Sequence, residues 1–320
     1  MLILPHHETS TLLRTLTHEE SRSIAEALEA ALIAFSTSPD RIKQPLRSSV
    51  TNGDDTTLFM PCSYSGTTCV KTVTVSPNHP PNGNITLLNS SGQLEAVMNA
   101  EEVTAYRTAL ASMLLLLKWK WDLKTAVVFG TGKQGEWAVR LLSKLFPGCR
   151  ITMVGRKVTA AEAKIVEILR SDGVELGYMN WKDDGLKVKI EEATAVFCCT
   201  PATEVLFPEG WVSGKTYVSA IGSYKPHMIE LDTELLKREG AMVVVDGMDA
   251  CCIEAGELIQ AGLEPKDLRE LGDVLAAEEC RDETTVFKCV GLAIMDLTVA
   301  KEVVRIAETR RVGTIVESFD

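Results

Sequence analysis

The 320-residue sequence predicts an α/β protein in which a doubly wound parallel sheet is joined to a second α+β domain with a mostly antiparallel sheet. Three observations support this prediction. The length corresponds to about two domains, and hydrophobic residues make up 45% of the chain, enough for a sizeable core. Strand-like segments follow one another without helices over residues 40–98. From about residue 124 they alternate with helices instead.

The first domain is expected to contain an amphipathic helix at residues 18–36, because Thr17 is a suitable N-cap and Glu20 completes a capping box. Residues 100–117 also have a strongly helical pattern. Between these helices, short apolar segments predict strands at residues 58–60, 69–75, 85–88 and 94–98. Turns are expected at Asn-Gly and Ser-Gly pairs, residues 82–83 and 91–92.

The second domain is predicted from its alternation of strands and helices. Strands are expected at residues 125–129, 150–155, 174–178, 195–199, 215–221 and 242–246. Helices are expected at residues 133–146, 159–171, 185–191, 231–238, 252–262 and 265–270, with a long final helix at 287–308. We therefore expect a dinucleotide-binding domain at residues 121–293, and a substrate-binding and dimerisation domain formed by residues 1–120 and 294–320.

A glycine-rich turn separates the first strand and helix of the alternating region. Gly130, Gly132 and Gly135 have the spacing G-x-G-x-x-G, which is typical of a Rossmann-type dinucleotide site. The first glycine suits a tight turn, the second admits a pyrophosphate, and the third lets the helix pack on the strand. The helix N-terminus then faces the anion. The predicted cofactor-binding residues here are Gly130, Thr131, Gly132, Lys133, Gln134 and Gly135.

The end of the following strand predicts which nicotinamide cofactor is bound. Folds that bind NAD usually place Asp or Glu there, but this strand is followed by Arg156 and Lys157, with no carboxylate. Arginine grips a phosphate with a planar fork, and lysine adds a point charge. NADP(H) is therefore favoured, and NAD(H) stays possible. The alternative interpretation is that both residues are solvated loop cations.

Charge and cysteine content exclude several classes of function. The net charge of −11 argues against nucleic acid or an anionic membrane as a general partner. The N-terminus does not resemble a secretory signal. The nine cysteines contain no C-x-x-C pair and fall at no ligand spacing with the histidines, so reduced thiols are expected, in the cytoplasm and without a metal site.

Three basic residues of the first domain are candidates for chemistry. Lys71 lies inside an apolar strand, where alternation places it on one face with Cys69 and Val73; if that face is covered, the lysine can titrate nearer neutrality and transfer protons. Arg47 lies in a loop, and Arg107 lies on the predicted helix 100–117. In the second domain the strand ends face the ligand crevice of such a sheet, and the residues expected there are Cys199, Thr200, Ile221 and Gly222.

Taken together, these segments resemble the ornithine cyclodeaminase/μ-crystallin family, in the family's order and over nearly the whole chain. The matching stretches are residues 59–61, 70–73, 101–112, 130–134, 220–226, 230–232, 245–246, 254–257 and 285–291, with Asp296. The resemblance implies a two-domain fold and a homodimer. It also implies that Arg47 and Arg107 hold a substrate carboxylate, that Lys71 is catalytic, and that Met60 and Tyr224 lie at the substrate.

The resemblance implies a reductase that transfers hydride from NAD(P)H to the C=N bond of a carboxylate-bearing imine or ketimine, or a related amino-acid dehydrogenase. Cyclodeaminases carry an aspartate where this chain has Tyr224. A neutral tyrosine cannot pair with a substrate ammonium as a carboxylate does. Two alternatives stay open: an ornithine cyclodeaminase with tightly bound NAD that releases ammonia, and a μ-crystallin-like NADPH-dependent binding protein for a small ligand.

Overall fold

A computed structural model of the chain describes residues 1–156, 159–277 and 283–317, and it separates into two compact units. Unit 1 consists of Met1–Arg107 and Leu292–Asp320, and unit 2 consists of Thr108–Gly291. The division at Arg107 falls within helix α3 (Ala100–Ala111). No helix among the described residues is both long enough and apolar enough to cross a membrane.

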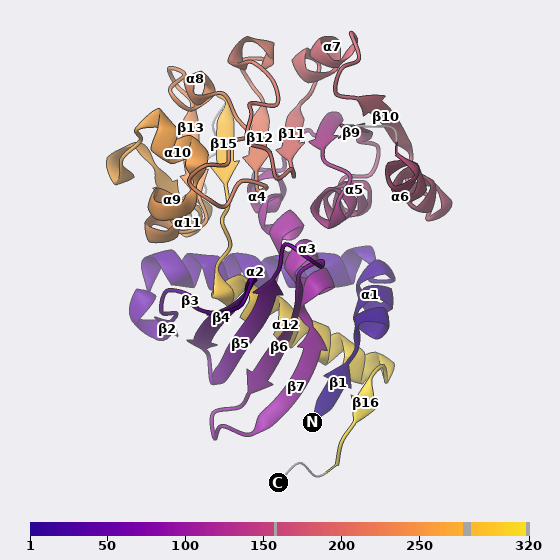
Figure 1. The fold of residues 1–320 in the computed structure, drawn as a ribbon, viewed down its shortest axis with the longest axis vertical. Helices are drawn as coiled ribbons and strands as arrows, with labels where there is room; N and C mark the ends of the chain where they lie inside the picture. The colour runs from indigo at the N-terminus through magenta and orange to yellow at the C-terminus, as the bar shows by residue number, and fades with distance from the viewer. Residues whose placement is uncertain (157–158, 278–282, 318–320) are drawn as a thin grey trace. The chain divides into compact units, whose positions relative to one another are not determined.

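Unit 1 is built on a mostly antiparallel sheet in the order β16-β1-β7-β6-β5-β4-β2, with β3 paired to β4 (Figure 1). Strands β1 and β7 pair in parallel, and the central pairs β4–β5, β5–β6 and β6–β7 are antiparallel. The strands are β1 (Leu2–Leu4), β2 (Ile42–Lys43), β3 (Ser48–Asn52), β4 (Asp55–Tyr64), β5 (Thr67–Val75), β6 (Asn82–Leu88), β7 (Leu94–Asn99) and β16 (Thr314–Ile315).

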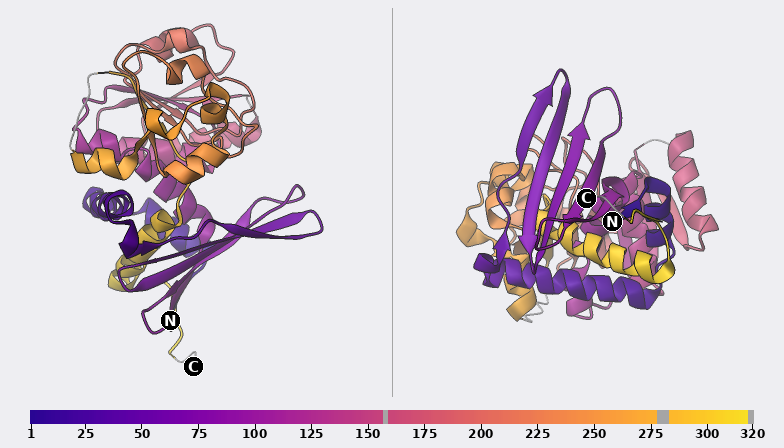
Figure 2. Two further views of the ribbon diagram at one scale, coloured as in Figure 1. Left: turned by 90° about the vertical axis from the view of Figure 1, so that its left-hand side faces the viewer. Right: turned by 90° about the horizontal axis from the view of Figure 1, so that it is seen from below.

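Helix α12 (Ala293–Arg310) crosses one face of this sheet and packs on β4, β5 and β6. Helix α2 (His18–Thr37) runs beside α12, as Figure 2 shows, and α1 (His6–Arg14) packs on α12 and β7. The capping box predicted at Thr17 and Glu20 is present at the start of α2. Alternation along β5 buries Cys69 and Lys71 on the face that α12 covers.

Unit 2 contains a parallel sheet in the order β10-β9-β8-β11-β12-β15-β13-β14. The strands are β8 (Thr125–Phe129), β9 (Arg150–Gly155), β10 (Leu176–Asn180), β11 (Ala195–Cys198), β12 (Tyr217–Ala220), β13 (Met242–Val245), β14 (Arg269–Glu270) and β15 (Thr285–Lys288). Strand order reverses between β8 and β11, so the ligand crevice of such a sheet is expected at the carboxyl ends of these two strands.

Helices flank the sheet of unit 2 and connect its strands (Figure 1). Alternate residues of the strands, including Val127, Val196 and Val243, form one apolar core with the helices that follow β10, β12 and β13. The helices are α4 (Leu114–Lys118), α5 (Lys133–Leu145), α6 (Ala160–Ser171), α7 (Leu186–Glu191), α8 (Thr233–Leu236), α9 (Met248–Glu254), α10 (Gly256–Ala261) and α11 (Leu271–Ala277), with 3-10 turns η2 (Glu209–Trp211) and η3 (Pro265–Asp267). The 3-10 turn η1 (Pro39–Arg41) belongs to unit 1.

The predicted fold class is confirmed, whereas several local predictions are wrong. The predicted helix 252–262 is divided at Ala255 between α9 and α10. Residues 82–83 lie inside β6 and not in a turn. Residues 100–117 form two helices, α3 and α4, because the chain turns at 112–113. Residues 265–270 form the turn η3 and the strand β14. The final helix begins at Ala293, since residues 285–288 form β15.

Candidate functional site

A buried cluster of charges lies on the inner face of the unit 1 sheet. Lys71, on β5, has a side chain only 3% exposed, and its Nζ donates to Oδ2 of Asp296 at 2.7 Å. Asp296, near the start of α12, is fully buried, and its Oδ1 accepts from Nε of Arg107 at 3.1 Å. The Asp296 carboxylate therefore bridges two cations, and both lie far from it in the sequence.

Further residues surround this cluster. Met60 is the cross-strand partner of Lys71 on β4 and is also buried. Arg107 donates a second hydrogen bond, from Nη1 to Sδ of Met295 at 3.4 Å. Two buried methionines therefore belong to this cluster, Met60 beside Lys71 in the sheet and Met295 against Arg107.

Burial is the main influence on the pKa of Lys71. It lowers the pKa of the ammonium group, and the positive charge of Arg107 acts in the same direction. The Asp296 carboxylate opposes this shift, because it attracts the charged form and accepts its hydrogen bond. A lysine of this kind is suited to proton transfer.

Arg47 lies, half-buried, in the loop between β2 and β3. Gln44 of the same loop accepts a hydrogen bond from the backbone N–H of Ile294 at 2.7 Å. The loop is therefore tied to the first turn of α12, two residues before Asp296.

The glycine turn of unit 2 has the local geometry that its spacing predicts. Gly130 has φ of +109°, and a Cβ there would lie 2.5 Å from the carbonyl oxygen of Cys199. A Cβ on Gly135 would lie 2.0 Å from the carbonyl oxygen of Gly130. Nothing lies within 4 Å of the position that a Cβ on Gly132 would occupy, and this residue is the N-cap of α5. The backbone N–H groups at this helix start can therefore be approached by an anion.

A pocket of about 280 Å³ opens at this turn. Its wall contains six of the residues predicted to bind a cofactor, which are Gly130, Thr131, Gly132, Arg156, Cys199 and Thr200. The other predicted cofactor residues that the structure describes lie outside that wall. Three of them begin α5: Lys133, which pairs with Glu136 at 3.2 Å, Gln134 and Gly135. The other two, Ile221 and Gly222, follow β12. Lys157 lies outside the described residues.

The pocket also contains a carboxylate that the sequence analysis did not anticipate. Glu162 lines it together with Arg156 and Trp181. Its Oε2 accepts from the backbone N–H of Thr159 at 3.0 Å, and its Oε1 accepts from Oγ1 of Thr131 at 3.3 Å. A Thr-x-x-Glu capping box, visible in the sequence, places this residue at the start of α6, beyond the strand end where a carboxylate was sought.

Arg156 lies over the indole ring of Trp181, with 5.5 Å between its Cζ and the ring centroid. Such a cation–π contact restrains the guanidinium at the pocket wall. Arg156 and Glu162 thus bring opposite charges to one pocket.

The last predicted residue of the substrate site, Tyr224, lies in unit 2 after β12. Its side chain is partly exposed, and Nζ of Lys225 lies 5.6 Å from its ring centroid. The contacts of Tyr224 within unit 2 assign it no chemical role.

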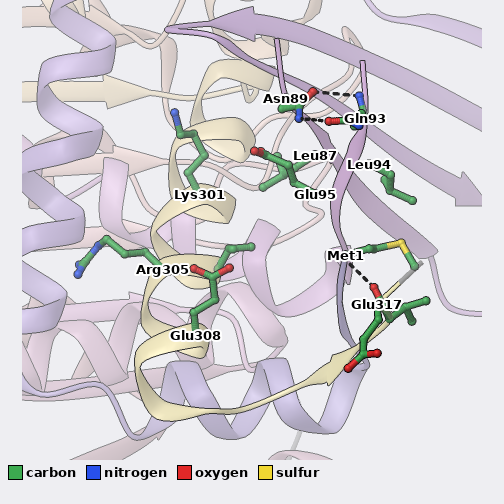
Figure 3. Close-up of a pocket in the computed structure, with 12 residues that line it drawn as sticks. Met1, Leu87, Asn89, Gln93, Leu94, Glu95, Lys301, Arg305, Glu308 and Glu317 are labelled. Atoms are coloured by element: carbon green, nitrogen blue, oxygen red, sulfur yellow. Dashed lines mark hydrogen bonds between the residues drawn. The ribbon is translucent and has the colours of Figure 1, made fainter. Parts of the chain in front are cut away.

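Unit 1 has another hollow, between the second half of α12 and the β6–β7 hairpin (Figure 3). Lys301, Arg305 and Glu308 of α12 line it, opposite Asn89 and Gln93, whose side chains are hydrogen-bonded to each other at 3.0 Å. None of the predicted site residues lines this hollow.

A Rossmann-type unit with a glycine-turn pocket, combined with an α+β unit that buries Lys71, Asp296 and Arg107, defines a two-part protein with a dinucleotide-binding fold. The chain belongs to the Ornithine cyclodeaminase/mu-crystallin family, whose profile matches residues 7–310.

Comparison with individual proteins agrees with this membership. The chain is 30% identical to a Delta(1)-pyrroline-2-carboxylate reductase of Bacillus cereus, over 91% of this chain and 95% of the relative. It is 30% identical to the ketimine reductase mu-crystallin of Rattus norvegicus, over 86% of this chain and 88% of the relative. The Delta(1)-pyrroline-2-carboxylate reductase of Thermococcus litoralis, solved with NADH and L-proline, has the same fold, with a TM-score of 0.83 at 24% identity over 99% of this chain and 100% of that one.

Proposed function

We propose that this chain is an NAD(P)H-dependent reductase of imines or ketimines that bear a carboxylate, or the related amino-acid dehydrogenase. The observation that carries the proposal is the buried bridge of Lys71, Asp296 and Arg107. It offers a proton donor of lowered pKa beside a guanidinium, the groups required by a C=N bond next to a carboxylate. The reductase activities of the two relatives at 30% identity support the same class of reaction.

Each site residue of unit 1 has a proposed role. Arg47 and Arg107 bind the substrate carboxylate, since two guanidinium groups suit its planar shape. Lys71 holds a proton on Nζ and passes it to the substrate nitrogen. Asp296 keeps Lys71 charged and oriented until that transfer, and Met60 supplies an apolar wall. Tyr224 of unit 2 is proposed to donate a hydrogen bond to the substrate.

The residues of unit 2 fit a nicotinamide nucleotide, which when bound supplies the hydride. The open backbone at Gly132 and the start of α5 would hold the pyrophosphate. Thr200 and Cys199, with Ile221 and Gly222, would form the surface for the nicotinamide end, because they follow β11, which borders the reversal of strand order, and its neighbour β12.

We further propose that NADP(H) is preferred, because Arg156 can grip a 2′-phosphate while Glu162 is already engaged by the N–H of Thr159. Arg156→Ala is expected to raise the Kd for NADPH about tenfold or more and to change the Kd for NADH little, since a charged hydrogen bond is lost only with NADPH. Fluorescence titration of both cofactors measures this. Arg150→Ala, at the other end of β9, is the control, and an unchanged preference in the Arg156 variant would contradict the proposal.

The experiment that tests the proposed reaction is a substrate panel with the purified full chain. NADPH and NADH oxidation is measured with pyrroline-2-carboxylate and piperideine-2-carboxylate, and ammonia release is measured with ornithine. Oxidation with at least one imine and no ammonia from ornithine is the expected result. Ammonia release without net cofactor turnover would identify a cyclodeaminase, and tight binding without any turnover would identify a binding protein.

We also propose that unit 1 binds the substrate and mediates homodimerisation, as the family resemblance implies, and that unit 2 binds the dinucleotide. The proposed substrate is a small carboxylate. Neither nucleic acid nor a membrane surface is an expected partner, because the chain carries a net charge of −11.

A further inference from the structure

A second buried carboxylate, Glu230 of unit 2, joins two loops at the carboxyl edge of the parallel sheet. It is fully buried. Its Oε1 accepts from the backbone N–H and the hydroxyl of Thr200, at 2.7 and 2.8 Å. Its Oε2 accepts from the backbone N–H groups of Gly222 and Ser223, at 2.7 and 3.2 Å. One side chain therefore receives four hydrogen bonds from the segments that follow β11 and β12.

These donors lie just beyond the end of the β ladder. The N–H of Ile221 donates to the carbonyl of Cys198 at 3.0 Å, but the N–H groups of Thr200, Gly222 and Ser223 turn to the carboxylate. Unpaired buried N–H groups are costly, and an ionised carboxylate has enough acceptor sites for all of them. Glu230 thus fixes the path of both loops with hydrogen bonds that the sheet does not provide.

The loops have little freedom around this anchor. A Cβ on Gly222 would lie 2.0 Å from the carbonyl oxygen of Thr200 and 2.6 Å from Oε1 of Glu230. The two segments therefore touch through backbone atoms, and a displacement of one requires a displacement of the other.

Glu230 is itself held by a second layer of charged residues. Oε1 of Glu257 accepts from its backbone N–H at 3.1 Å, and Lys288 lies 3.3 Å from Oε2 of Glu257. Lys288 also donates to the carbonyl and hydroxyl of Ser223, at 2.5 and 2.6 Å. All three charged side chains are fully or almost fully buried. A buried network in which each member is satisfied is rigid, which suits a group that must hold a ligand surface still.

We propose that Glu230 is a positioning residue that fixes the loops after β11 and β12 as the surface for the nicotinamide half of the cofactor. The inference rests on the proposed function for the identity of the cofactor. Thr200 lines the pocket of the glycine turn but does not belong to the start of α5, to which the pyrophosphate is assigned, so other residues hold the adenosine and pyrophosphate half. The loss of Glu230 should then weaken one half of the cofactor site selectively.

The test compares binding of NADH with binding of ADP, measured by calorimetry on the full chain well below its melting temperature. Both ligands lack a 2′-phosphate, so the comparison does not depend on cofactor preference. Glu230→Gln keeps the shape but replaces one acceptor oxygen with a donor that faces N–H groups. It is expected to weaken NADH binding about tenfold or more and to leave ADP binding within about twofold of wild type.

Two control variants separate positioning from loss of stability. Glu234→Gln, at an exposed residue of α8, should change the affinity for neither ligand. Leu235→Ala removes a fully buried core side chain of the same helix; it should lower the melting temperature but preserve the ratio of the two affinities.

The inference is overturned if Glu230→Gln weakens the binding of NADH and of ADP by the same factor, or if it changes neither affinity. It is also overturned if the wild type binds NADH no more tightly than ADP. Failure of the proposed function is a separate result, because a chain that binds NADH but reduces no imine still gives the binding comparison in full.

Discussion

Lys71→Met is expected to lower kcat for reduction of a cyclic imine carboxylate by about 10²- to 10⁴-fold, the usual contribution of a positioned proton donor. Methionine matches the length of the lysine stem and avoids an unpaired buried ammonium group, so the variant should remain folded. Cofactor binding should be unchanged, because Lys71 belongs to unit 1 and the glycine-turn pocket to unit 2. Steady-state kinetics and an NADPH titration check both statements.

The pH dependence of wild-type activity should reflect the titration of Lys71. Lys71 donates a proton only when charged, and burial lowers its pKa, so activity should fall on the alkaline side below the ordinary pKa of lysine. The residual activity of Lys71→Met should lack this alkaline limb. Lys43→Met, an exposed lysine of β2, is the matched control and should retain both rate and profile. Full activity in Lys71→Met would rule out the proposed role.

Asp296→Asn is expected to have the largest effect on stability, about 3–5 kcal/mol of the free energy of unfolding. The substitution leaves Lys71 and Arg107 buried without their shared counter-ion, and the new amide presents a donor to one of the two cations. Denaturant unfolding measures the loss. Asp54→Asn, an exposed residue between β3 and β4, should change the unfolding free energy by much less.

The same substitution should also move the alkaline limb of activity. The Asp296 carboxylate raises the pKa of Lys71, so its removal takes away the main influence that opposes the lowering by burial and by Arg107. The protonated form is then lost at a lower pH, and the alkaline limb of Asp296→Asn should lie below that of wild type. A limb that stays in place would mean that Asp296 has only a structural role.

The buried cluster shows both the reach and the limit of sequence reasoning. Alternation along β5 predicted that Lys71 shares a face with Cys69, and burial of that face follows from α12. The partner of Lys71 is 225 positions away, so no local pattern could pair it with Asp296. The family resemblance included Asp296 without a role, and only the packing of α12 on the sheet supplies one.

The glycine turn was predicted from its spacing, because the approach of Gly135 to Gly130 lies within one short segment, whereas the contact of Gly130 with Cys199 is tertiary. The carboxylate in the same pocket was missed. Glu162 reaches the pocket from the first turn of the following helix, and its capping box was a readable signal that we did not connect with the cofactor.

Wrong element boundaries have particular causes. The predicted helix 100–117 is interrupted where the carbonyl of Ser112 accepts a hydrogen bond from the hydroxyl of Tyr217 at 2.8 Å, a tertiary contact that no periodicity reveals. The final helix was predicted to begin at residue 287, but residues 285–288 are needed as β15 between β12 and β13. Tertiary hydrogen bonding and sheet pairing outweighed local helical pattern in both cases.

Net hydride transfer to a carboxylate-bearing imine is the central claim, and isotope transfer tests it most directly. The full chain is incubated with NADPH deuterated at the transferable position of nicotinamide C4 and with pyrroline-2-carboxylate, and the product is examined by mass spectrometry and NMR. We predict proline with one deuterium at Cα and a stoichiometric amount of oxidised cofactor. Proline without deuterium, or no product from any carboxylate-bearing imine despite tight cofactor binding, would contradict the assignment.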